Sequence, residues 1–99
     1  MNFQEAFQKL PADVQTAIYS VETSRAIEQI ADKHYLLIDK MGLLAEEVGL
    51  VMLGATHPKD FIRNLSDKLG IDRETAKKIA EDVNQQIFAK VRESLKIRH

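Results

Sequence analysis

The sequence has no cysteine and no tryptophan, and only 6% of its residues are aromatic. Without cysteine the chain cannot form disulfides, use a thiol in catalysis or bind a metal through thiolates. Since a chain without thiols suits a reducing compartment, we expect a cytoplasmic protein. The scarcity of aromatic side chains argues against a rich ligand pocket, and we expect neither a cofactor nor a small-molecule ligand.

The sequence also lacks an excess of charge of one sign. Its 14 basic and 15 acidic residues leave a net charge of −1, whereas a nonspecific nucleic-acid binder presents a surplus of positive charge. The charge is distributed unevenly along the chain, with a net charge of −4 in residues 1–56 and +3 in residues 57–99. The longest run without a charged residue, 48–58, is shorter than the about 20 residues that span a bilayer. Because the first residues, MNFQEAFQKLP, are also unlike a signal peptide, we expect no membrane association.

Helical periodicity of apolar residues extends along the whole chain of 99 residues, of which 44% are hydrophobic. We expect one domain over residues 1–99, an all-α, compact bundle of five or six helices with a long C-terminal helix. The expected helices cover residues 3–10, 11–19, 21–33, 35–54, 58–69 and 72–96. The pattern leaves open whether 11–19 and 21–33 are continuous, although Ser20 is suited to cap a separate helix.

The segment 35–54 is the most apolar part of the chain and is predicted to be a central buried helix. Its charged residues would form a narrow strip facing water: Asp39, Lys40, Glu46 and Glu47. Gly42 and Gly49 share one face of this helix, and we expect them to permit close packing between helices.

The stretch LSDKLGIDRETAKKI, residues 65–79, predicts a tight corner between two helices. Gly70 stands where the first helix can end in a left-handed conformation, and Ile71 can then pack back on Leu65. Asp72 is suited to cap the next helix. Capping chemistry therefore accounts for the stretch without any further function.

The same stretch resembles the helix-turn-helix of bacterial DNA-binding proteins, in which the second helix reads the major groove. Under this alternative, DNA would contact the 58–69 and 72–96 helices through Arg63, Lys68, Arg73, Thr75, Lys77 and Lys78. Three acidic residues share the outward face of the second helix, namely Asp72, Glu74 and Glu81. Because this face has no surplus of positive charge, we interpret the stretch first as a structural corner.

No catalytic or metal-binding pattern emerges from the remaining residues. The histidines, His34, His57 and His99, lack metal-ligand spacing and are expected at helix ends or on the surface. The acidic pairs Glu46/Glu47 and Glu81/Asp82 are adjacent in helices, where neighbouring side chains point about 100° apart, and so we expect solvated faces. We therefore predict that the chain is not an enzyme and holds no metal.

Three segments, LPADVQTAIYS, LGATHPKDF and IAEDVNQQIFAKVRESL, resemble small helical proteins of unknown function from candidate-phyla bacteria. The resemblance extends over most of the chain. It implies a bacterial, cytoplasmic, all-helical domain, and it implies no activity and no functional residue.

Together these patterns predict a non-catalytic helical module for protein–protein interaction. Its partner would be another protein or a second copy of the chain, in a homodimer or other small homo-oligomer. The residues predicted for the partner surface lie off the main apolar stripes: Leu36, Leu43, Leu50 and Phe88. DNA binding by the helix-turn-helix-like corner remains the alternative.

Overall fold

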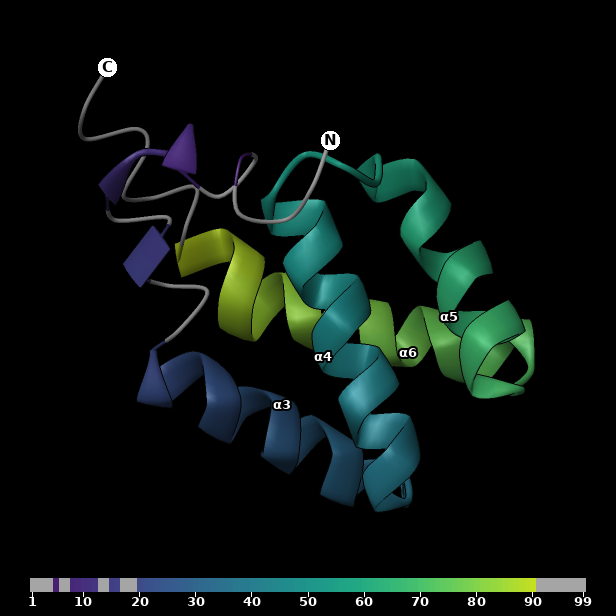
Figure 1. Ribbon diagram of the computed structural model, residues 1–99. Helices are drawn as coiled ribbons and strands as arrows, with labels where there is room; N and C mark the ends of the chain where they lie inside the picture. Colours follow the sequence, from purple (N-terminus) through teal and green to yellow (C-terminus); the bar gives the residue numbers. More distant parts are fainter. Residues whose placement is uncertain (1–4, 6–7, 13–14, 17–19, 91–99) are drawn as a thin grey trace.

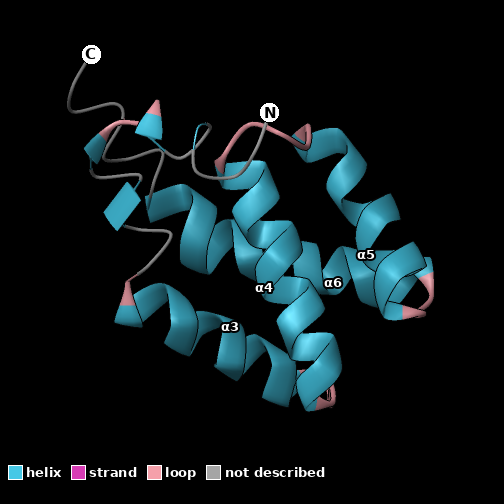
Figure 2. Ribbon diagram, viewed as in Figure 1, coloured by secondary structure: helices cyan, strands magenta, loops and turns pink. Residues whose placement is uncertain are grey.

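Helices are the only regular secondary structure in the part of the chain that the structure describes. The computed structural model describes residues 5, 8–12, 15–16 and 20–90 (Figure 1). It contains α3 (Val21–Lys33), α4 (Ile38–Met52), α5 (Phe61–Leu69) and α6 (Arg73–Val83), with the 3₁₀ turn η1 (Pro58–Asp60) before α5 and the π turn η2 (Asn84–Phe88) after α6 (Figure 2). The all-α prediction is confirmed. The count of five or six helices is not confirmed, because the expected helices 3–10 and 11–19 lie partly outside the described residues. His99 lies outside them as well.

The helix α3 begins as a separate helix at Val21. Ser20 has an extended backbone with ψ of 149°, and its side chain accepts a hydrogen bond of 2.9 Å from the N–H of Thr23. An extended residue interrupts the helical hydrogen-bond ladder, and the hydroxyl replaces one of the lost bonds. The question that the sequence left open is thereby answered, since a break at Ser20 precedes α3.

The connection between α3 and α4 contains a residue in an unfavourable conformation. Tyr35 has a φ of 58°, in the left-handed region, and the N–H of Leu36 reaches back to the carbonyl of Ala31 at 2.8 Å. This bond closes the end of α3 in the manner that usually employs glycine. Leu37 follows with an extended backbone, so α4 begins only at Ile38. The observed helix α4, Ile38–Met52, is therefore shorter at both ends than the helix expected over 35–54.

The α5–α6 corner confirms the capping predicted from the sequence. Gly70 ends α5 with a φ of 65°, and the N–H groups of Gly70 and Ile71 both donate to the carbonyl of Ser66. The hydroxyl of Ser66 in turn donates to the carbonyl of Ile71 at 2.7 Å. Asp72 then caps α6 by accepting from the N–H of Thr75. Local hydrogen bonds therefore fix the angle of this corner.

The C-terminal helical segment differs from the long regular helix expected over 72–96. The α-helix α6 ends at Val83, η2 continues it to Phe88, and residues beyond Lys90 lie outside the described part. The four-residue spacing of Ile79, Val83 and Ile87 would make a straight α-helix rotate these side chains progressively away from the core. In η2 each hydrogen bond spans five residues instead of four, which offsets that rotation. All three side chains are accordingly buried.

The buried core joins all four helices. In Figure 1, α6 crosses behind α4, while α3 and α5 lie at the two sides, and each of α3 and α5 packs against both α4 and α6. The largest apolar side chains with almost no exposure are Ile30, Leu44, Leu65, Leu69, Ile79, Val48 and Val83. Phe61 and Phe88 meet edge to face at 5.7 Å, so η2 is anchored on α5.

Two of the residues with a left-handed backbone, Tyr35 and Gly70, yield a paired stability prediction. Tyr35→Gly should raise the free energy of unfolding by about 0.5–1 kcal/mol, because glycine accepts a positive φ and the Tyr35 side chain is exposed. Gly70→Ala should lower it by about 1 kcal/mol; an added Cβ meets no atom within 4 Å, so the backbone conformation alone accounts for the loss. Urea unfolding measures both changes, and stabilisation by Gly70→Ala would contradict the argument.

Candidate functional site

The residues predicted to contact DNA lie on α5 and α6, and two of them are already paired with acids. Arg63 forms an ion pair of 3.4 Å with Asp60, and Lys68 forms one of 2.7 Å with Glu47. On α6, Arg73, Lys77 and Lys78 are exposed, whereas Thr75 is half-buried. The exposed acidic residues alongside them are Asp72, Glu74 and Glu81. Since the side-chain hydrogen bond with Thr75 lowers the pKa of the Asp72 carboxyl, that group is negative at neutral pH.

Glu47 is buried in the core and is not part of a solvated strip as the sequence suggested. Its side chain has no exposure, and its Oε2 accepts a hydrogen bond of 2.7 Å from the ammonium of Lys68 on α5. Its Oε1 has no hydrogen-bond partner among the described residues. The hydrogen bond to Glu47 raises the pKa of Lys68, with Glu46 adding to the effect through its charge. The pair therefore consists of two opposite charges that join α4 to α5.

The expectation of a solvated Glu81/Asp82 pair is also wrong, because Asp82 is largely buried. Its carboxylate lies 2.8 Å from Nε2 of His34 and 3.1 Å from Nζ of Lys33. Burial by itself would raise the pKa of Asp82, but the hydrogen bonds from His34 and Lys33 prevail and lower it. The carboxylate is ionised at neutral pH and connects the end of α3 to α6. No group of three or more potential metal ligands occurs among the described residues.

The large apolar side chains that face solvent cluster between α3 and α4. Tyr35 is 91% exposed, Leu37 73% and Ile38 81%. The only other large apolar side chain of comparable exposure in the described part is Val21, at the start of α3. An exposed patch of this kind on a small domain is typical of a surface that meets another molecule.

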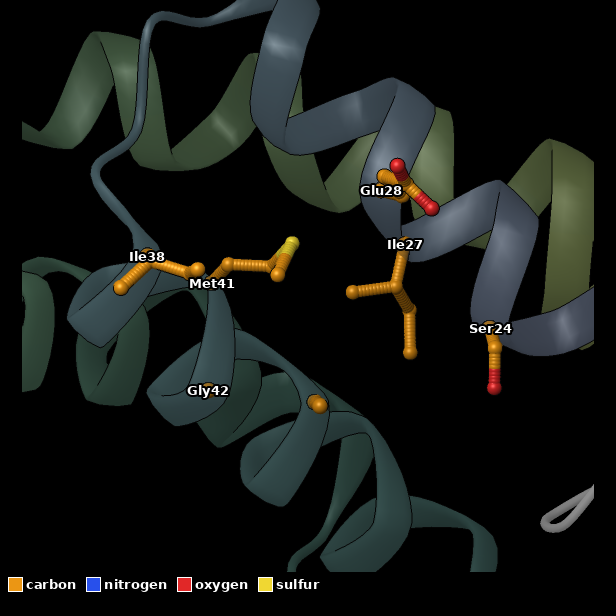
Figure 3. A pocket seen from close by; sticks show the side chains of 7 residues that line it. Ser24, Ile27, Glu28, Ile38, Met41 and Gly42 are labelled. Carbon is orange, nitrogen blue, oxygen red and sulfur yellow. The ribbon is translucent and has the colours of Figure 1, made fainter.

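A shallow groove of about 300 Å³ begins beside this corner and runs between α3 and α4 (Figure 3). Met41 of α4 and Ile27 of α3 point toward one another across it, as Figure 3 shows. The residues that line it are Ser24, Ile27, Glu28, Ile38, Met41, Gly42 and Ala45. Ile38 belongs to both features. We call the groove together with Tyr35, Leu37 and Ile38 the α3–α4 surface.

Glycines in α4 leave open space on the same side of the molecule. A Cβ built on Gly42 or Gly49 would meet no atom within 4 Å, so neither glycine makes a close contact within the described part of the chain. The close packing between helices that we expected at these glycines is therefore not found among the described residues. Glycine in the middle of a helix lowers stability by about 0.5–1 kcal/mol relative to alanine. No contact within the described part of the chain requires them.

The residues that the sequence predicted for a partner surface are not among the exposed apolar side chains. Leu36, Leu43 and Phe88 are half-buried and pack against the core, and Leu50 is half-buried as well. A signal for the exposed apolar side chains was present in YLLI, residues 35–38, because four consecutive apolar residues point in all directions and cannot share one buried face. Which of the four are exposed depends on where α4 begins, and the periodicity did not reveal that.

Comparison with protein-family models, with curated proteins and with solved structures finds no match for this chain. The resemblance to helical proteins of candidate-phyla bacteria therefore stays a prediction. Among the described residues, no helix combines the length and the apolar character that crossing a membrane requires.

The Glu47–Lys68 pair should show strong coupling in stability. Lys68→Met removes the partner of a buried carboxylate and should lower the free energy of unfolding by about 2–3 kcal/mol, less than in a fully buried pair because water reaches Lys68. The double change Glu47→Met/Lys68→Met should recover most of this loss, because it removes both charges. Urea unfolding of the single and double variants measures the coupling, and a neutral Lys68→Met would contradict it.

Proposed function

We propose that this protein is a non-catalytic helical module that binds another protein through the α3–α4 surface. The observation that carries the proposal is the exposure of Tyr35, Leu37 and Ile38 together at one corner. Side chains of this size contribute roughly 1.5–3 kcal/mol each when they are removed from water. A partner that covered all three would gain several kcal/mol from this corner alone.

The backbone at Tyr35 supports the same proposal. A residue with a Cβ holds a left-handed conformation where glycine would be favoured, and its ring is almost fully exposed. Neither the backbone strain nor the exposure of the ring benefits the isolated fold. Tyrosine is one of the residues that contribute most to protein interfaces, because its ring combines apolar area with a polar hydroxyl.

The proposal includes the functional expectations drawn from the sequence. The module acts without a cofactor or metal and in the cytoplasm, and its partner is a second copy or another protein. The His34–Asp82 pair supports a non-catalytic role, because this contact connects the end of α3 to α6 and thereby has a structural purpose.

A photo-crosslinking amino acid at position 38 tests the proposal. When the protein is made in its own cell, Ile38→p-benzoylphenylalanine should yield a discrete protein adduct, because position 38 lies at the centre of the α3–α4 surface. The matched control is the same amino acid in place of Lys77, which is exposed on α6. An adduct of twice the chain mass indicates self-association. Absence of any adduct at position 38, or equal adducts at both positions, would refute the proposal.

DNA binding at the α5–α6 corner is the second candidate function, and the tight corner at Gly70 favours it. Three cations, Arg73, Lys77 and Lys78, remain exposed for phosphate contacts, but they lie beside the acidic residues Asp72, Glu74 and Glu81. We expect no binding of duplex DNA even at about 50 mM salt, where phosphate contacts are strongest. A fluorescence-anisotropy titration checks this. Binding that weakens with salt and disappears in Lys77→Glu/Lys78→Glu would favour the DNA-binding function instead.

A further inference from the structure

The groove between α3 and α4 has a shape and a charge that specify its occupant. We infer that it receives an amphipathic α-helix of a partner protein, with basic residues on both sides of that helix's apolar stripe. This inference rests on the proposed function and deepens it, because it states the chemistry of the partner.

The lining of the groove favours a helix over a small molecule. A volume of about 300 Å³ is at the lower end for small-molecule sites, and among the described residues that line the groove only Ser24 and Glu28 have polar side chains. Such a site has few groups to orient a small ligand. A shallow apolar channel between two helices instead suits the anchors of a third helix, which recur at every third or fourth residue.

The small residues of α4 allow such a helix to approach closely. Gly42 and Ala45 line the groove, and Gly49 follows four residues after Ala45, so the three lie on one side of α4. The space above Gly42 and Gly49 is open. A partner helix over this side would contact the α4 backbone directly and would use the space that the two glycines leave.

The exposed charges around the groove are mainly acidic. Glu28 lines it from α3, and Asp32 follows one turn later. On α4, Asp39 and Glu46 flank Gly42 at three residues before and four residues after, which places them beside it on the helix. Among the basic residues of α3 and α4, Arg25 is exposed, Lys33 pairs with Asp82 and Lys40 is half-buried.

This acidic border distinguishes a basic partner from a second copy of the chain. A twofold dimer would bring the same surface against itself and would set Glu28, Asp39 and Glu46 against like charges. Basic residues flanking the apolar stripe of a partner helix would meet these acids with opposite charge. They would also make the association faster at low salt than at high salt.

Selection from a peptide display library tests the inference with the full chain as the target. The library holds helical peptides of about five turns with randomised apolar and flanking positions. Selected peptides should carry Lys or Arg on both flanks, and their affinity should fall at least tenfold between low and high salt. Ile38→Glu should weaken binding at least tenfold, whereas Lys77→Glu, on α6, should leave it unchanged. Circular dichroism establishes that each variant is folded.

A charge reversal provides the second arm. Glu28→Lys/Glu46→Lys should shift the selected peptides from basic to acidic flanks, because the apolar groove is retained and only its border changes sign. Peptides without a charge preference, or a mass that doubles with concentration and returns to the monomer in Ile38→Glu, would overturn the inference. If no peptide is selected while position 38 still crosslinks a protein, the helical partner is wrong and the proposed function stands. If position 38 crosslinks nothing as well, both fail.

Discussion

The arrangement of the helices depends on the carboxylate of Glu47, which is buried in the core and held 2.7 Å from the ammonium of Lys68. A buried charge strongly destabilises a fold unless an opposite charge reaches it, so α5 must lie where Lys68 can extend from solvent to this position. The side of α4 that bears Glu47, together with Leu44 and Val48, is thereby fixed as the core side. The hydrogen-bonded corner at Gly70 then sets the direction of α6 relative to α5.

The same constraint determines which side of α4 remains in solvent. With its core side committed to α5, α4 presents Ile38, Gly42 and Ala45 outward, beside α3. The contacts of Asp82 with His34 and Lys33 hold the end of α3 against α6. The walls of the groove are α3 and α4. The Glu47–Lys68 contact holds α4 on α5, and the contacts of Asp82 hold α3 on α6. The α3–α4 surface is exposed because the opposite side of α4 is buried in the core.

Features set by neighbouring residues were predictable from the sequence. The cap at Asp72, the left-handed Gly70 and the capping of η1 by His57, whose ring accepts from the N–H of Lys59, all involve residues within a few positions of one another. Features set by distant residues were not predictable. Glu47 and Lys68 are 21 positions apart, and His34 and Asp82 are 48 apart, so periodicity assigned both acids to solvated faces.

The sequence by itself determined that the chain is helical, where α6 begins and how α5 turns into α6, because these depend on helical periodicity and on hydrogen bonds between neighbouring groups. The tertiary structure alone decided which acids are buried, where α4 begins and which apolar side chains remain exposed. Glu47 has the same local surroundings as any helical glutamate, and only the arrival of Lys68 makes its burial tolerable. Likewise Ile38 is apolar in sequence, and its exposure follows from the side on which α4 meets the rest of the core.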